Sequence, residues 1–596
     1  MKSLKSFLKK FFVRVLAVIG ALTLVGIIIV VIGLAVVVPA RKAVPDKVIL
    51  EVDFEKPLVE YVPQDPLALA LMREMTTVRD VVEALERASE DKRVVGLVGK
   101  IGSARMGLAV IQEIRDAVKA FTKKGKFAVA YSETFGEFGP GNGAYYLATA
   151  FDEIYLQPSG DLGLTGLMYE CPFVRGTLDK LCMTARIDHR KEFKNAKNIF
   201  TETKFTEPHR EAMAKLMDSQ FDQIVLGIVE ARGVNKEELT TIIDDAPLLG
   251  EEAVKAKLVD GLLYRDEVYE KVKGRVKGSK LLYLSKYLQR AGRPHKDGPT
   301  IALIYGVGGV HRGPSEYNAL SGSPSMGSET VAAALRAAAA DDKVKAIVFR
   351  VNSPGGSYVA SDTIWREVVK AKEAGKPVVV SMGNVAGSGG YFVSMSATKI
   401  VAQPGTVTGS IGVVAGKMLT RKFWQDYAGI TWDNVHTSRN ATIWAGTHDY
   451  SPEQWQKVQD FLDRVYEDFT IKVSQGRQME KEKVLEVAKG RIWTGEDAKE
   501  HGLVDELGGF DVALRLARTE AGLKPDAAIK VAVFPRPKRL IETLLKRGPD
   551  SSEPRAEVVA AHQALETIRP LYRMAKEIGL VEENDVLRIP WFKESW

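Results

Sequence analysis

Residues 375–381 read Gly-Lys-Pro-Val-Val-Val-Ser, and residues 125–131 read Gly-Lys-Phe-Ala-Val-Ala-Tyr. Each stretch follows a helical pattern, and its apolar run bounded by a glycine is typical of a buried strand. Such a likeness between two distant parts of one chain indicates an internal duplication.

The duplication continues downstream of these strands. Gly-Asn-Gly-Ala-Tyr-Tyr at 141–146 matches Gly-Ser-Gly-Gly-Tyr-Phe at 387–392, and Leu-Val-Asp occurs at both 258–260 and 503–505. The first copy carries about four extra residues in the loop 132–141. The two halves therefore share one folding pattern with a local insertion.

Each copy alternates short β-branched runs with helical stretches. Ala-Ile-Val-Phe at 346–349 is such a run, and Ser361–Glu373 is such a helical stretch. This alternation indicates parallel βαβ units, so we predict an α/β protein with two tandem βαβ domains.

The chain of 596 residues is too long for one small module. We expect an N-terminal copy over 45–290 and a C-terminal copy over 299–535. The polar segment Arg290–Pro299, which contains glycines and prolines, separates them as a linker. Beyond the repeat lies a C-terminal tail, 536–596.

An N-terminal membrane segment is also predicted. The segment 1–14 is rich in basic residues. The segment Val15–Val38 that follows contains no charged residue, and as a helix it is long enough to cross a hydrocarbon core of about 30 Å. A secretory signal has an apolar stretch of only about 7–15 residues, so we interpret this one as an uncleaved anchor in membrane lipid. The excess of basic residues before the span predicts a cytoplasmic N-terminus. The soluble part would then lie on the periplasmic side of the inner (cytoplasmic) membrane.

Composition and charge narrow the remaining possibilities. Hydrophobic residues make up 45% of the chain and charged residues 27%, which excludes a disordered protein. The net charge of +7 equals the contribution of the first 42 residues, so the body is neutral. A neutral body argues against nucleic-acid binding. Cys171 and Cys182 are the only cysteines, and the sequence leaves open whether they pair.

Two glycine-rich motifs could carry chemistry. Asn-Ser-Pro-Gly-Gly at 352–356 directly follows a predicted strand, and its bare backbone N–H groups suit an oxyanion. Ala-Gly-Ser-Gly-Gly at 386–390 follows the next strand and presents Ser388 as a nucleophile at a helix start. Either motif alone would be explained by a tight turn. Their occurrence after successive parallel strands favours a catalytic site.

The base that would activate such a serine is less evident. None of the eight histidines lies in a repeat-matched loop near the motifs, and Ala386 breaks the Gly-x-Ser-x-Gly pattern of α/β-hydrolases. A lysine held neutral is the remaining common base, but no spacing rule identifies it. The sequence that begins at His209 does not match the zinc-binding motif His-Glu-x-x-His, and the chain contains no Walker A motif for binding nucleotide phosphates. We therefore predict neither a metal nor a cofactor.

The motifs at 352–356, 386–391 and 408–412, in a duplicated chain with an N-terminal anchor, resemble the signal peptide peptidase A (protease IV) family in its long double-domain form. The resemblance covers most of 45–535. It implies a Clp/crotonase-like fold, a homo-oligomer of four chains, and a Ser–Lys dyad. In that family the first domain supplies the lysine and the second supplies the serine.

The resemblance also implies roles for individual residues. Ser388 would be the nucleophile and Lys194 the general base, within Phe-Lys-Asn-Ala at 193–196. This segment corresponds to a Tyr-Lys-Ser-Ala-type motif, from which it departs at both flanking positions. Lys191 and Lys197 are the nearest alternatives. The remaining implied residues are the hydroxyl that orients the lysine amine, Ser410, and the oxyanion glycines, Gly355, Gly356 and Gly389.

The repeat itself supports one site per chain. Asn142 stands where the second copy has Ser388, Leu164 stands where it has Ser410, and about Asn440 stands where the first copy has Lys194. Residues 104–106 replace the Pro-Gly-Gly segment. Neither half therefore contains a complete set.

These observations predict a membrane-anchored serine endopeptidase that degrades cleaved signal peptides and other short apolar peptides. A crotonase-like acyl-CoA enzyme is the nearest enzymatic alternative, and turnover of thioesters against peptides would distinguish the two. From a different class, an inactive membrane-tethered scaffold built on a protease fold is the second alternative.

Overall fold

The computed structural model describes residues 43–63, 72, 75–102, 106–318 and 323–535. The predicted basic segment 1–14, the predicted span Val15–Val38 and the tail 536–596 lie outside the described residues. Across the described ranges, no helix is both long and apolar enough to cross a membrane.

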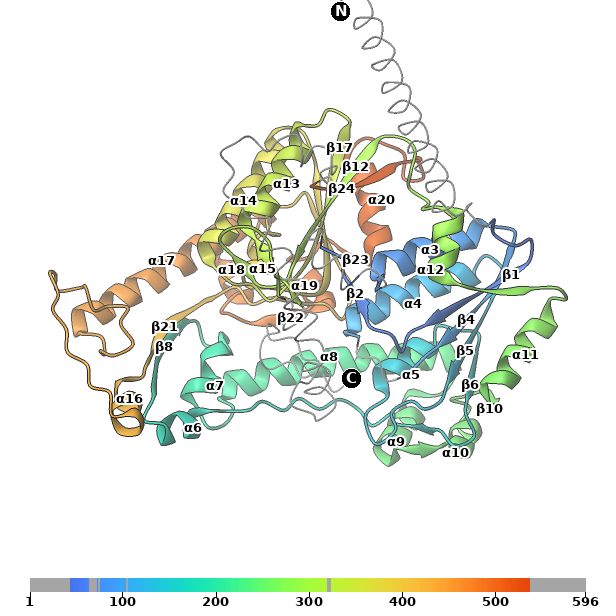
Figure 1. The fold of residues 1–596 in the computed structure, drawn as a ribbon, viewed down its shortest axis with the longest axis horizontal. Coiled ribbons are helices and arrows are strands. Elements are labelled where there is room, and N and C mark those ends of the chain that lie inside the picture. Colours follow the sequence, from blue (N-terminus) through green and yellow to red (C-terminus); the bar gives the residue numbers. More distant parts are fainter. Residues whose placement is uncertain (1–42, 64–71, 73–74, 103–105, 319–322, 536–596) are drawn as a thin grey trace, which may run out of the picture.

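The first copy is built around a six-stranded parallel sheet with the order β10-β6-β5-β4-β1-β11 (Figure 1). Its strands are β1 (Val48–Asp53), β4 (Val94–Lys100), β5 (Phe127–Ser132), β6 (Glu153–Leu156), β10 (Gly261–Leu262) and β11 (Lys280–Tyr283). Its helices are α3 (Val78–Glu90), α4 (Leu108–Thr122), α5 (Asn142–Ala148), α6 (Arg175–Lys180), α7 (Asn198–Thr201), α8 (Glu207–Arg232), α9 (Lys236–Asp245), α10 (Gly250–Lys255), α11 (Arg265–Arg275) and α12 (Leu284–Ala291).

The second copy is built around an eight-stranded sheet with the order β22-β20-β18-β17-β12-β24, in which β19 pairs with β18 and β23 pairs with β19. Its strands are β12 (Thr300–Val307), β17 (Val344–Ser353), β18 (Val378–Gly387), β19 (Lys399–Ala402), β20 (Val407–Gly409), β22 (Ile492–Thr494), β23 (Glu506–Leu507) and β24 (Lys530–Phe534). Its helices are α13 (Ser328–Ala340), α14 (Tyr358–Glu373), α15 (Gly389–Phe392), α16 (Arg421–Ala428), α17 (Pro452–Arg477), α18 (Lys481–Val487), α19 (Gly495–Glu500) and α20 (Phe510–Glu520).

The two sheets repeat the same strand order. The series β23-β19-β18-β17-β12-β24 corresponds strand by strand to β10-β6-β5-β4-β1-β11. Matching side chains make matching bonds: the Tyr145 hydroxyl donates to the Leu258 carbonyl at 2.6 Å, and the Tyr391 hydroxyl donates to the Leu503 carbonyl at 3.0 Å. The prediction of a duplicated α/β chain is confirmed.

Burial on both faces explains the continuous apolar strands. In β18, Val378 and Val380 belong to one core cluster, whereas Val379 belongs to the cluster on the other face. All three are fully buried. A strand covered by helices on both sides has no solvated face, which is why its sequence does not alternate with polar residues.

The two copies differ beyond the end of this shared strand. In the second copy β18 continues to Gly387 and pairs there with β20, through Val385–Val407 and Gly387–Gly409. In the first copy β5 ends at Ser132 and the chain enters the longer loop. The extension of β18 leads directly to the serine motif.

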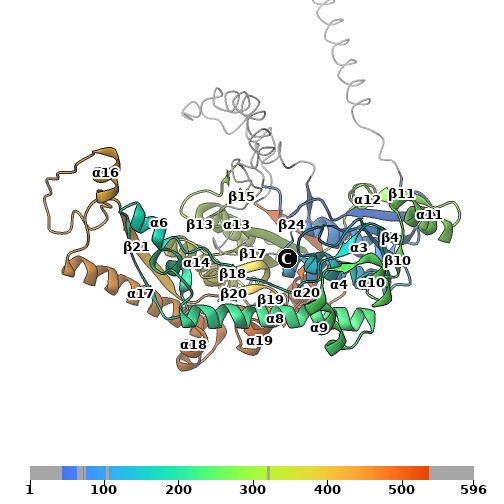
Figure 2. The same ribbon diagram turned by 90° about the horizontal axis from the view of Figure 1, so that it is seen from below.

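The copies are joined by strands that the repeat did not predict. Strand β8 (Thr184–Arg190) of the first copy pairs antiparallel with β21 (Val413–Leu419) of the second, from Arg190 opposite Val413 to Thr184 opposite Leu419. The long helix α8 contacts both α5 of its own copy and β22 of the other. Figures 1 and 2 show β8 and β21 side by side and α8 running along both copies.

A buried ion cluster lies at the same interface. Arg350 on β17 is bonded to Glu60 at 3.0 Å and to Glu113 of α4 at 2.8 Å, and all three side chains are buried. Removing one partner from such a cluster would leave an uncompensated charge in a low dielectric. The ion cluster therefore ties the second sheet to the first copy.

Candidate active site

Ser388 lies at the junction of β18 and α15. It is the residue before the helix, with φ of 53°, and its N–H donates to the Gly409 carbonyl at 2.9 Å. A non-glycine residue in this left-handed region is uncommon and is often found at functional sites. The strand-to-helix turn expected around this serine is therefore present.

Lys194 follows β8 and reaches across to the second copy. Its Nζ lies 3.0 Å from Ser388 Oγ, 2.9 Å from Ser410 Oγ and 2.8 Å from the Ser410 carbonyl oxygen. The side chain is buried. The structure therefore brings together the three residues expected to act as base, nucleophile and orienting hydroxyl.

Burial changes the protonation of this lysine. It lowers the pKa of Lys194 from 10.5 to about 7, and no neighbouring carboxylate opposes the shift. Desolvation disfavours the ammonium form, since a charge taken out of water loses its hydration. A substantial fraction of Lys194 is consequently a neutral amine near pH 7.

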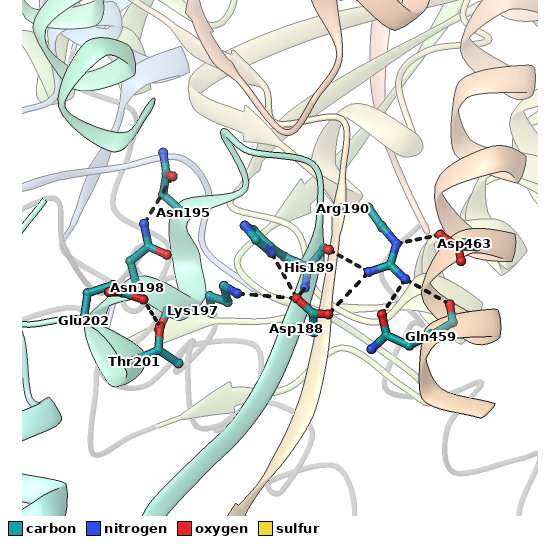
Figure 3. Close-up of polar contacts among 10 residues, drawn as sticks. All are labelled: Asp188, His189, Arg190, Asn195, Lys197, Asn198, Thr201, Glu202, Gln459 and Asp463. Atoms are coloured by element: carbon teal, nitrogen blue, oxygen red, sulfur yellow. Dashed lines mark hydrogen bonds and ion pairs between the residues drawn. The ribbon is translucent and has the colours of Figure 1, made fainter. Parts of the chain in front are cut away.

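A polar network anchors the segment that carries Lys194 (Figure 3). Arg190 donates to Asp463 at 2.6 Å and to the Gln459 side chain at 2.8 Å, both on α17 of the second copy. Asp188 lies between Arg190, at 3.6 Å, and Lys197, at 3.4 Å. The end of β8 is thus fixed from both sides.

The two alternative lysines have other contacts. Lys197 pairs with Asp188, and the Lys191 amine lies 5.9 Å from the centre of the Tyr466 ring. Of the three lysines, Lys194 is the one whose amine is hydrogen-bonded to Ser388. The geometry therefore favours Lys194 over both alternatives.

The predicted oxyanion glycines do not all present a free N–H group. The Gly355 N–H donates to Ser353 Oγ at 3.2 Å, which corrects its expected role as an oxyanion donor. In the described part of the chain, the N–H groups of Gly356 and Gly389 have no acceptor. A Cβ on Gly389 would lie 3.1 Å from the Gly356 nitrogen, so these two groups are close together. Gly355 instead supplies the turn, with φ of 103°.

A cavity of about 980 Å³ opens beside these groups. Both copies contribute to its wall, and the catalytic candidates Ser388, Lys194 and Ser410 line it. The apolar part of the wall next to Ser388 is formed by Tyr169, Met213, Val385, Val407 and Ile492. A cleft of this size and character can hold an extended apolar segment.

The repeat-matched positions in the first copy have structural contacts. Asn142 donates to the Gly166 carbonyl at 2.8 Å and accepts from the Gly166 N–H at 3.1 Å. Leu164 is buried and Asn440 is exposed, while residues 103–105 lie outside the described ranges. Cys171 and Cys182 are free thiols.

Sequence reasoning missed several residues of the site. Gly490 contacts Lys194, and Met213 of α8 reaches the cavity from the first copy. His209, whose segment was considered in the sequence only to reject a zinc motif, also lines the cavity. No local pattern marks these residues, because Gly490 meets Lys194, and Met213 and His209 reach the cavity beside Ser388, only through the pairing of the two copies.

Comparisons with known proteins show the family of this chain. The model of peptidase family S49 matches residues 120–278 and 370–524. Protease 4 of Salmonella typhi is 34% identical over 458 residues, which cover 75% of this chain and 72% of that protein.

Two further relatives show the same likeness. The chloroplastic serine protease SPPA of Arabidopsis thaliana is 30% identical over 472 residues, covering 78% of this chain and 68% of that protein. A putative signal peptide peptidase SppA of Enterococcus faecium is 34% identical over 190 residues, covering 32% of this chain and 55% of that protein. With both halves matched by the family model and relatives aligned along most of its length, this chain belongs to peptidase family S49, a family of serine proteases.

Proposed function

We propose that the chain is a membrane-anchored serine endopeptidase that cuts short apolar peptides, including cleaved signal peptides, with a Ser388–Lys194 dyad. The observation that carries the proposal is the 3.0 Å distance between the buried Lys194 Nζ and Ser388 Oγ in the wall of the cavity. A nucleophile within hydrogen-bond reach of a neutral base is the arrangement that acyl transfer requires.

The first half of the reaction follows from these positions. The neutral amine of Lys194 accepts the proton of the Ser388 hydroxyl as Oγ attacks the carbonyl carbon of the scissile peptide bond. Ser410 holds the amine toward Ser388 with its hydroxyl and carbonyl oxygens, at 2.9 and 2.8 Å. The N–H groups of Gly356 and Gly389 donate to the oxyanion that forms.

The second half reverses the proton transfer. The Lys194 ammonium gives its proton to the leaving amine, and the peptide bond breaks to leave an acyl ester on Ser388. A water molecule, deprotonated by the neutral Lys194, then attacks the ester carbonyl. The bond to Ser388 Oγ breaks, the Lys194 ammonium returns its proton to that oxygen, and the carboxylic acid product is released. Since lysine accepts and returns every proton, the cycle requires neither a metal nor a cofactor.

The apolar wall supports the proposed substrates. Met213, Val407 and Ile492 beside Ser388 would bury apolar side chains, from which the hydrophobic effect gives about 25 cal/mol per Å². A relative is named as a putative signal peptide peptidase. Cleaved signal peptides are apolar segments, and an anchor at Val15–Val38 would keep the enzyme at the membrane where they are released.

The remaining parts of the proposal concern address and assembly. We infer that the catalytic copies lie on the periplasmic side of the inner membrane, from the basic residues before Val15. Assembly into a homotetramer is proposed from the family resemblance. The acyl-CoA and scaffold alternatives have no specific observation in their favour, since a serine with an adjacent neutral lysine suits hydrolysis through an acyl-enzyme.

The dyad can be tested by single and double substitution. Ser388→Ala, Lys194→Ala and the double variant should each lose peptide hydrolysis by about 10³-fold or more, because the two groups act as one unit. The losses should not add. Lys191→Ala and Lys197→Ala are the matched controls, and full activity in Lys194→Ala would reject the assignment. Labelling with a serine-reactive probe, followed by peptide mapping, should identify Ser388.

The glycine at 490 provides a test of how Lys194 is positioned. A Cβ there would lie 2.6 Å from both the nitrogen and the Cβ of Lys194, so Gly490→Ala should displace the lysine and lower kcat/KM at least tenfold. Gly522→Ala is the matched control, because Gly522 also has positive φ but has no atom within 4 Å of its ideal Cβ. Equal effects of the two substitutions on kcat/KM would contradict the proposed role of Gly490.

The pH dependence should report the titration of Lys194. The kcat/KM value should rise with pH, with a midpoint near the pKa of about 7, and level off above it. Because burial lowers the folded-state pKa, the penalty on folding is fully present below about pH 7 and fades as pH rises toward 10.5. Lys194→Met should abolish that pH dependence of unfolding free energy. If kcat/KM still rises with pH around 7 in Lys194→Met, Lys194 is not the base.

The proposed orientation can be tested in cells. A protease added to spheroplasts should digest the body of the protein, and a reporter fused after residue 596 should work only if it is active outside the cytoplasm. Deleting 15–38 should release the protein from the membrane fraction. Full protection of the body until the membrane is lysed would reverse the orientation.

A further inference from the structure

One polar side chain in the cavity wall has no part in the proposed catalytic cycle. His209 lies on α8, one helical turn before Met213, and both residues line the cavity. Residues one turn apart share a helix face, and Met213 on this face packs in one apolar cluster with Val407 of the second copy. His209 therefore occupies the apolar part of the cleft.

The imidazole of His209 is buried, and one of its two nitrogens has no polar partner among the described residues. Its Nδ1 atom is inaccessible to solvent and has no hydrogen bond to any described residue. Its neighbours are aromatic: the Phe205 ring lies edge-on at 4.8 Å between centroids, and the Phe173 ring lies at 6.2 Å. Buried polar groups in folded proteins are nearly always hydrogen-bonded, so an unpartnered one in a binding cavity requires an explanation.

The same surroundings determine the protonation state of His209. Burial lowers the pKa of His209 to about 4, so the ring is neutral at physiological pH. A neutral imidazole has one N–H donor and one nitrogen acceptor. It can pair with a neutral polar group, whereas a charged side chain in this apolar wall would lose its hydration.

We propose that His209 is a specificity-determining residue, which hydrogen-bonds the hydroxyl group of a substrate side chain seated between α8 and the ends of β18, β20 and β22. Because Nδ1 is closed to solvent, the ring must rotate toward the cavity, after which a substrate hydroxyl can donate to a ring nitrogen or accept from its N–H group. The apolar and aromatic wall suits a side chain with an apolar body, which points to tyrosine or threonine. This inference rests on the proposed peptidase function.

Paired peptides that differ by one hydroxyl group test the inference. An apolar peptide that the enzyme cleaves is first mapped by mass spectrometry to locate the cut bond. Tyr and Phe, and then Thr and Val, are compared at each of the three positions on either side of that bond. At one position the peptide with Tyr or Thr should have a kcat/KM about tenfold higher than its partner with Phe or Val. The partner peptide lacks the hydroxyl and would leave the His209 imidazole without a hydrogen bond.

Variants of His209 assign the preference to the imidazole. His209→Phe keeps an aromatic ring but removes both nitrogen atoms. In this variant the ratio of kcat/KM for the hydroxyl peptide to kcat/KM for its partner should fall to one or below. His209→Asn keeps a donor and an acceptor, and it should retain part of the preference. The ratio of two peptides is measured within each variant, so any loss of folded enzyme cancels. Met213→Leu, which alters the same wall without changing its polarity, should leave the hydroxyl ratio in place.

The outcomes separate the inference from the function on which it rests. If the parent enzyme cleaves peptides but shows no hydroxyl preference at any position, the role of His209 is wrong and the peptidase function stands. The role is also wrong if the preference persists in His209→Phe. If the parent enzyme cleaves no peptide, both the inference and the proposed function are overturned.

Discussion

The antiparallel pairing of β8 with β21 is the constraint on which the site depends. Lys194 and Ser388 belong to different copies of the repeat, and no local segment connects them. The ladder from Arg190–Val413 to Thr184–Leu419 fixes the register of one copy on the other. Because Lys194 follows the end of this ladder closely, a slip of one residue would turn the strand's side chains to the other face.

The two copies share one fold but differ around the site. Both copies fold into the same order of parallel strands, yet the second copy extends β18 to Gly387, directly before Ser388, whereas the first copy ends β5 earlier. Asn142, at the position matching Ser388, ties down the loop at Gly166. The second copy thus carries the Ser388 turn, while the first contributes Lys194 and helix α8 to the same cavity.

Burial gives the site its chemistry as well as its shape. The lysine amine accepts protons near neutral pH because the interface between the copies removes it from water, not because another charge repels it. Closure of the interface by Arg350, Glu60 and Glu113 therefore helps to keep the amine out of water, since a loosened interface would rehydrate it. Fold stability and base strength are coupled through the same surface.

The sequence by itself determined the duplication, the α/β class and the two glycine-rich turns, because strand and turn signals are local and repeat at matching positions. It also indicated Ser388, whose setting among glycines is a local pattern, and family resemblance pointed to Lys194. Only the tertiary structure decided that Gly355 donates its N–H to Ser353, that Gly490 contacts Lys194, and that His209 faces the cavity. Those facts depend on contacts between residues far apart in the chain, which no periodicity or spacing encodes.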